Sequence, residues 1–132
     1  MNLLDRHVHI IAPSEAVAED LSPTLGLSCV LCCDPNVCNG VEYAPLVLVV
    51  GWERTSAAVC ASVRTQTRAP IVLIVEDASH HAVIQGLNAG ADLVMARCSD
   101  AGELKARIRA LIRRSQMPCP ADTYRLLRFS TP

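Results

Sequence analysis

Four cysteines crowd into one short segment, Cys29, Cys32, Cys33 and Cys38. A Cys-x-x-Cys spacing is typical of zinc sites and of dithiol redox sites. Cys29 and Cys32 fall on a predicted strand, where residues three apart point to opposite faces. No second pair with matching spacing follows, as a zinc site would require. Core packing is therefore the favoured role of these thiols, and a redox-sensing or zinc-sensing domain that uses the Cys29-Cys38 cluster is an alternative.

Histidines add a second group of side chains with possible chemistry. His7 and His9 lie two apart on a predicted strand and so share one face. A neighbouring strand would bring thiols close to them, although plain packing near the sheet edge is favoured. His80 and His81 open a predicted helix, where exposed polar residues are the common role and pH sensing is the alternative.

Charged residues follow several apolar runs. Glu53 and the pair Glu76 and Asp77 each come after a predicted strand, and Arg97 comes after another. Two neighbouring carboxylates can bind a cation, and an arginine can pair with an anion. A solvated rim at the edge of a sheet is the favoured interpretation of the acids.

The elements that would position these side chains alternate between strand and helix. Short apolar runs rich in Val, Ile and Leu predict five strands, at residues 7–11, 27–33, 46–50, 71–75 and 93–96. Helices are predicted from residue 15, at 55–65, from 79 to 90 and from 100 to 114, with only a rudimentary helix at 37–43. This alternation predicts an α/β fold with a parallel sheet and helices on both faces.

Helix ends carry recognisable signals. Ser14 and Ser79 are predicted N-caps, and Asp100 with Glu103 three residues later resembles a capping box. Gly90 stands where a left-handed residue closes a helix.

Composition limits the function classes. The 132 residues are 51% hydrophobic and 3% aromatic, with a net charge of −1. This balance predicts one domain with an aliphatic core, and gives no electrostatic reason to expect nucleic acid or an anionic membrane as partner. Seven cysteines, an odd number partly placed in apolar strands, favour a reducing cytoplasm. We expect no signal peptide and no membrane span.

We expect the domain to cover residues 1–115. Residues 116–132 carry two prolines at their start and read as a linker or tail. Tyr124-Arg125-Leu126 resembles the start of a winged-helix effector domain, a short match.

The segment 45–114 resembles the receiver domain of two-component response regulators, most closely the OmpR/PhoB type. The similarity rests on Pro70-Ile71-Val72, on the run from Gly86 to Asp92, and on the run from Glu103 to Arg114. It is weak over residues 1–44. The resemblance implies a flavodoxin-like (CheY-like), doubly wound five-stranded parallel sheet of order 2-1-3-4-5.

The positions that carry phosphorylation chemistry in that family are changed here. In receivers, carboxylates at the carboxyl ends of the first and third strands hold Mg²⁺ beside the acceptor aspartate. The resemblance places Ala12 and Pro13 at the acidic pair and Gly51 at the acceptor. It likewise places Val75 at the phosphoryl-contacting hydroxyl, Arg97 at the lysine, Cys98 at the following proline and Val94 at the aromatic switch. We therefore expect an atypical receiver (a pseudo-receiver) that is not phosphorylated, with no catalytic residue, no metal and no cofactor.

The resemblance also implies a homodimer through the fourth helix, fifth strand and fifth helix. Glu103 and Arg107 match the fifth-helix members of the family's interface salt bridges, whereas Val83 and Leu93 stand where charged partners are common. With Leu87 these residues would form a more apolar dimer face.

The function expected from the sequence is a regulatory and dimerisation module in transcription regulation or signal transduction, not an enzyme. DNA contact would come only through an effector domain outside this chain. An anion-binding flavodoxin-like module, with its ligand near Arg97, is the second alternative.

Overall fold

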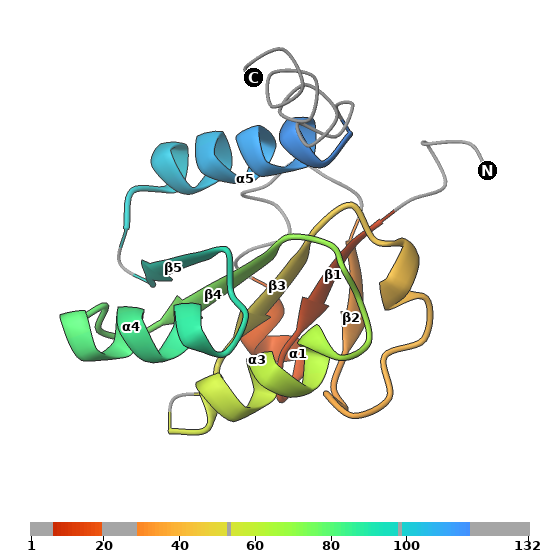
Figure 1. Ribbon diagram of the computed structural model, residues 1–132, viewed down its shortest axis with the longest axis horizontal. Helices are drawn as coiled ribbons and strands as arrows, with labels where there is room; N and C mark the ends of the chain where they lie inside the picture. The colour runs from red at the N-terminus through yellow and green to blue at the C-terminus, as the bar shows by residue number, and fades with distance from the viewer. Residues whose placement is uncertain (1–6, 20–28, 53, 98, 117–132) are drawn as a thin grey trace, which may run out of the picture.

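The computed structural model describes residues 7–19, 29–52, 54–97 and 99–116. Its strands are β1 (Val8–Ile11), β2 (Cys29–Cys32), β3 (Val47–Val50), β4 (Ile71–Val75) and β5 (Leu93–Ala96). All neighbouring pairs are parallel, and the order is β2-β1-β3-β4-β5 (Figure 1). The predicted α/β fold with strand order 2-1-3-4-5 is confirmed.

The helices are α1 (Glu15–Ala18), the 3-10 helix η2 (Val41–Tyr43), α3 (Ser56–Arg64), α4 (His80–Asn88) and α5 (Ala101–Gln116). Each predicted helix is therefore present, and the rudimentary helix after β2 is a single 3-10 turn. The predicted tail lies outside the described residues apart from Gln116, which ends α5 one residue beyond the expected domain boundary.

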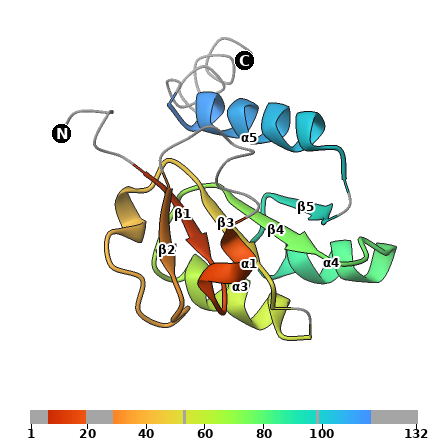
Figure 2. The same cartoon turned by 180° about the vertical axis from the view of Figure 1, so that it is seen from behind.

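Two apolar clusters sandwich the sheet, because every residue of β1, β3 and β4 is buried and alternate side chains point to opposite faces. On one face α1 and α5 pack through Ala18, Leu104 and Ile108. On the other face η2 and α3 pack through Val41, Val59, Cys60 and Val63, and α4 follows beside them. Figure 2 shows α5 on one side of the sheet and α3 with α4 on the other. β2 and β5 are the edge strands.

Most of the predicted helix ends are confirmed. The Ser79 hydroxyl accepts a hydrogen bond from the Ala82 amide at 3.2 Å, and an Asp100 carboxylate oxygen accepts one from the Glu103 amide at 3.0 Å. Gly90 has φ +114°. Ser14 is the N-cap residue of α1 as predicted, but its side chain makes no capping hydrogen bond, and the helix that follows has only four residues.

Strand boundaries differ slightly from the prediction. β1 begins at Val8, one residue late, and the part of the expected second strand before Cys29 lies outside the described residues. β2 ends at Cys32 because the chain turns at once: the Asp34 carboxylate accepts a hydrogen bond from the Asn36 amide at 2.9 Å.

Candidate functional site

The carboxyl ends of parallel strands meet at one edge of the sheet, and a small hollow lies there beside β3 and β4. Its volume is about 10 Å³, which is about the space that one water molecule needs. Of the predicted site positions, Gly51, Val75 and Arg97 line this hollow. Ala12 is fully buried and Pro13 is exposed. Cys98 lies outside the described residues.

Gly51 has no room for a side chain. Its φ is +86°, a backbone conformation that residues with a Cβ rarely adopt. A Cβ at this position would lie 2.7 Å from Val17 Cγ1 and 3.0 Å from Pro13 Cδ. The predicted acceptor position is therefore packed shut by α1 and by the turn after β1.

Arg97 faces a carboxylate of the same chain. Its Nη1 lies 3.5 Å from Oε1 of Glu76, and both side chains are about half-exposed. The Arg97 amide also donates to the Val75 carbonyl at 2.7 Å. An exposed ion pair contributes little stability, but its carboxylate competes with any anion for the Arg97 guanidinium. The anion-binding alternative gains no support from this contact.

Trp52 ties the site to the end of β1. Its indole Nε1–H donates to the Ile11 carbonyl at 3.3 Å. The amide of the same peptide group, on Ala12, donates to the Cys32 carbonyl at 3.1 Å. The Ile11–Ala12 peptide group thus bridges Trp52, which follows β3, and Cys32, the last residue of β2. The sequence analysis did not single out Trp52. Its place just after a buried strand, in a chain with few aromatic residues, was the signal that could have identified it.

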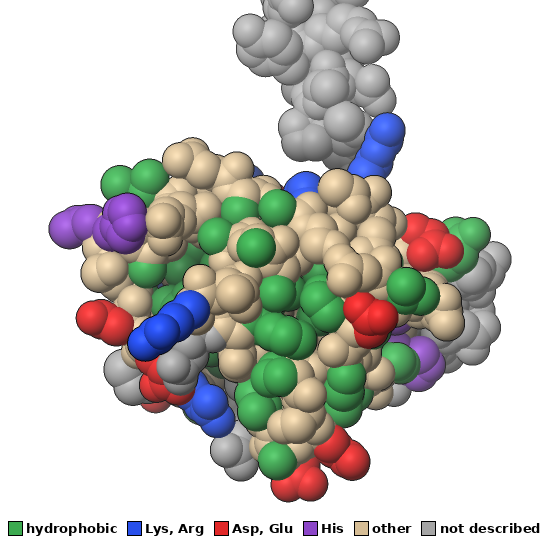
Figure 3. All heavy atoms as spheres, turned by 90° about the horizontal axis from the view of Figure 1, so that it is seen from below, with side chains coloured by type: hydrophobic (Ala, Val, Ile, Leu, Met, Phe, Trp, Pro, Cys, Tyr) green, Lys and Arg blue, Asp and Glu red, His purple; other side chains and the backbone are tan. Residues whose placement is uncertain are grey.

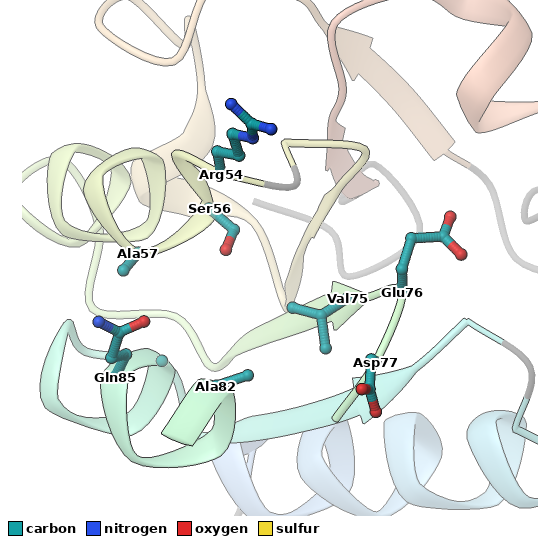
Figure 4. Close-up of a pocket in the computed structure, with 9 residues that line it drawn as sticks. Arg54, Ser56, Ala57, Val75, Glu76, Asp77, Ala82 and Gln85 are labelled. Atoms are coloured by element: carbon teal, nitrogen blue, oxygen red, sulfur yellow. The ribbon is translucent and has the colours of Figure 1, made fainter. Parts of the chain in front are cut away.

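A larger hollow of about 150 Å³ lies next to this edge, between the start of α3 and α4. Charged and polar side chains of both signs line it, including Arg54, Glu76, Asp77 and Gln85. Figure 4 shows Arg54 and Glu76 extending in different directions, away from Val75 in the middle. Their charges do not converge on one point, as a ligand site would require.

The predicted dimer-face residues occupy three neighbouring elements. Val83 and Leu87 lie on α4, half-buried and exposed respectively, and Leu93 is half-buried on β5. Glu103 and Arg107 on α5 are exposed and pair with each other at 3.1 Å within the helix. Leu93 and Arg107 line one hollow of about 270 Å³. Ile84, which the sequence analysis did not single out, is 57% exposed on α4 beside them.

The cysteine segment is partly as predicted. Cys29 packs on the α5 side of the sheet and Cys32 on the α3 side, so the two do lie on opposite faces. The structure adds a pair that spacing did not indicate, since Cys32 Sγ lies 3.3 Å from Cys38 Sγ. Within the described ranges no group of three or more His, Cys, Asp or Glu side chains is arranged to hold a metal ion.

His9 is the buried histidine of the pair on β1. It is 6% exposed, and its Nδ1 has no hydrogen-bond partner among the described residues. Burial lowers the pKa of His9, and His7 acts in the same direction, while Glu42 opposes them.

Surface charge is mixed. On the face in Figure 3, acidic, basic and histidine side chains lie mostly towards the outline, and hydrophobic side chains occupy the middle. This face therefore carries no continuous basic patch of the kind that binds nucleic acid. Among the described helices, none combines the length and the apolar composition needed to cross a bilayer.

Comparison with solved structures identifies the fold. A two-component response regulator from Clostridium difficile superposes with a TM-score of 0.71 and 20% identity, over 86% of this chain and 100% of that one. The beryllofluoride-activated receiver domain of Klebsiella pneumoniae RstA gives 0.68 and 22%, over 82% and 99%. A Burkholderia thailandensis protein named for pilus assembly gives 0.69 and 11%, over 80% and 97%. At these identities the likeness shows a receiver-like fold. No family model matches the sequence, and no curated protein does.

Proposed function

We propose that this chain is a regulatory module with a receiver fold that signals without aspartyl phosphorylation. Its fold is that of response regulator receivers, and its contacts with other protein surfaces would set its state. In this proposal the module is of the OmpR/PhoB type and acts in transcription regulation or signal transduction. The domain itself catalyses no reaction.

The closed acceptor position carries the proposal. A phosphorylated receiver needs a carboxylate at this position, within reach of a bound Mg²⁺. Here the position is Gly51 at φ +86°, with Val17 and Pro13 against the space where a Cβ would go. Ala12 and Pro13 offer no carboxylate at the end of β1.

The pairing of Arg97 with Glu76 supports the same proposal. A cation at this edge would serve to hold the phosphoryl oxygens, and Arg97 Nη1 instead has a carboxylate at 3.5 Å. Glu76 therefore places a carboxylate beside the Arg97 guanidinium without any modification.

The test is exposure of the full chain to acetyl phosphate and, separately, to beryllofluoride with Mg²⁺. Amide signals in ¹H–¹⁵N NMR spectra are the readout, with a phosphorylatable receiver as the positive control. We expect the signals of Gly51 and Arg97 to stay in place at reagent concentrations that saturate the control. Saturable shifts at these two residues, or a phosphoryl group on any carboxylate by mass spectrometry, would overturn the proposal.

Self-association through α4, β5 and α5 is the second part of the proposal. Ile84 and Leu87, three residues apart on α4, are 57% and 46% exposed. Leu93 and Arg107 line the hollow between β5 and α5. Large apolar side chains on the surface of a small domain favour a protein partner, and a second copy of the chain is the partner that the family resemblance suggests.

A further inference from the structure

Two thiols meet at the end of β2. Cys32 Sγ lies 3.3 Å from Cys38 Sγ, and both sulfurs also lie 3.2 Å from the carbonyl oxygen of Asp34. An S–S bond is about 2.05 Å long, so the two sulfurs need to approach by little more than 1 Å, roughly, to be joined. Cys32 and Cys38 are both free thiols in this structure.

The loop that carries Cys38 is anchored to α3 and does not depend on the thiols. Gln66 accepts a hydrogen bond from the Cys38 amide at 3.1 Å and donates one to the Pro35 carbonyl at 2.7 Å. Ser62 donates to the Asn36 side chain at 2.9 Å. These contacts hold the loop back against β2, so the two sulfurs are kept close in the reduced protein.

We propose that Cys32 and Cys38 form a reversible disulfide, which makes the end of β2 an oxidative modification site. The inference rests on the position of the two sulfurs and on the anchored loop, and it stands whether or not the domain signals without phosphorylation.

The solvent exposure of the two thiols decides which of them reacts first with an oxidant. Cys32 is half-buried, whereas Cys38 is 5% exposed, so an oxidant in solution reaches Cys32 first. Burial raises the pKa of Cys38 to about 12, and the hydrogen bond and charge of Cys32 add to the rise.

The oxidant that we propose for the two thiols is a peroxide. The Cys32 thiolate attacks one peroxide oxygen, the O–O bond breaks, and the leaving hydroxide takes a proton to become water. Cys38 sulfur then attacks the Cys32 sulfur, the S–O bond of the sulfenic acid breaks, and the hydroxide leaves as a second water with the Cys38 proton. The two thiols lose two electrons and the peroxide gains them.

The site is coupled by hydrogen bonds to the edge described above. The Cys32 carbonyl accepts from the amide of the Ile11–Ala12 peptide group, whose carbonyl accepts from Trp52. Trp52 is the one tryptophan of the chain. Its fluorescence therefore reports on one position, two hydrogen bonds away from Cys32.

The experiment treats the full chain with hydrogen peroxide or with glutathione disulfide, then alkylates the remaining thiols in denaturant. Cleavage before Asp34 separates Cys32 from Cys38. We expect a peptide of residues 20–33 joined to one of residues 34–76, loss of two alkylatable thiols, a change in Trp52 fluorescence, and full reversal by dithiothreitol.

Three variants assign the bond. Cys32→Ser and Cys38→Ser must each abolish the joined peptide, and the neighbouring exposed Cys33→Ser must keep it. With glutathione disulfide, Cys38→Ser traps the glutathione adduct on Cys32, and wild type carries roughly tenfold less of it because the second thiol attacks within the same molecule.

A joined peptide that survives in Cys32→Ser would overturn the proposal. So would wild type that accumulates the glutathione adduct as Cys38→Ser does. Where a serine at the buried position 38 unfolds the chain, fragmentation of the wild-type joined peptide makes the assignment, because it distinguishes Cys32 from Cys29 and Cys33, and Cys38 from Cys60.

Discussion

The Nη1 of Arg64 lies 3.4 Å from Oδ2 of Asp92, which ties the end of α3 to the residue before β5. The same guanidinium donates to the carbonyls of Thr67, Ala69 and Gly90 at 2.8, 2.6 and 3.1 Å. The Asp92 carboxylate in turn accepts from the Ile71 amide at 2.8 Å, at the start of β4. One arginine therefore joins α3 to the loops that lead into β4 and β5.

Arg64→Lys should destabilise the protein despite keeping the charge. An ammonium group cannot reproduce the planar fork, so carbonyls between α3 and β5 lose their donor. We expect a loss of about 1–3 kcal/mol in the free energy of unfolding, measured by urea denaturation. Arg68→Lys, at an exposed position nearby, is the control and should change little. Equal effects of the two variants would contradict this account.

Gly86→Ala should also destabilise the protein. A Cβ on Gly86 would lie 2.7 Å from Val94 Cγ2 and 2.9 Å from Leu73 Cδ2, where α4 packs on β4 and β5. Overpacking costs about 1–3 kcal/mol, which exceeds the gain of about 0.5–1 kcal/mol from alanine in a helix. Gly102→Ala is the matched control.

At Gly102 the added Cβ would lie 3.0 Å from Asp100 Oδ2, in the exposed first turn of α5 and away from the core. This oxygen accepts the capping hydrogen bond from the Glu103 amide, so the gain of up to about 1 kcal/mol from alanine is offset by any weakening of the cap, and the change should stay within about 1 kcal/mol. The midpoint of thermal unfolding of each variant is the measurement. A Gly86→Ala variant that is more stable than wild type would contradict the prediction, because α4 would then have room to shift on the sheet.

Stability should fall on acidification because of His9. Burial lowers the pKa of His9 in the folded state below its ordinary value of 6.5, so the unfolded chain binds the proton more tightly. The contribution of His9 is complete above pH 6.5, declines as the pH falls through that value, and levels off below the folded-state pKa. His9→Leu should remove this part of the pH dependence.

Urea denaturation between about pH 8 and pH 5 measures the effect. His80→Gln, on the exposed start of α4, is the control and should keep the wild-type decline. A decline that persists unchanged in His9→Leu would assign the acid sensitivity to other groups.

Leu87→Glu should weaken self-association. Leu87 is 46% exposed on α4, beside Ile84, and burying a carboxylate at an apolar contact is unfavourable. We expect the dimer dissociation constant to rise by about tenfold or more, with unchanged circular dichroism. Sedimentation velocity is the measurement. Val37→Glu, in the loop after β2 and 60% exposed, is the control. A wild type that stays monomeric well above micromolar concentration would remove this face from the proposal.

Apolar runs were enough to predict the five strands, because buried parallel strands have a continuous apolar signature, whereas the order of the sheet came from the family resemblance. Ser79, Gly90 and Asp100 were found because capping depends on the identity of one residue and its neighbours. Ser14 was placed correctly at the N-cap of α1, but residue identity alone does not tell whether the side chain makes the capping hydrogen bond, and here it does not.

The candidate site was only partly predictable. The resemblance brought Gly51, Val75 and Arg97 to one edge, but it gave no indication that Glu76 faces Arg97. The Cys32–Cys38 contact was missed because it depends on the path of the loop at residues 33–40. Gln66, far along the chain, holds that loop in place, and strand periodicity carries no information about such a contact.

The backbone at Gly51 also bears on how the chain can change over generations. An aspartate there becomes tolerable only when Pro13 and Val17 give up the space and the peptide leaves its left-handed conformation. A single Gly51→Asp substitution is therefore expected to strain the backbone and to clash with α1. A carboxylate at this position would need compensating changes at positions 13 and 17 as well.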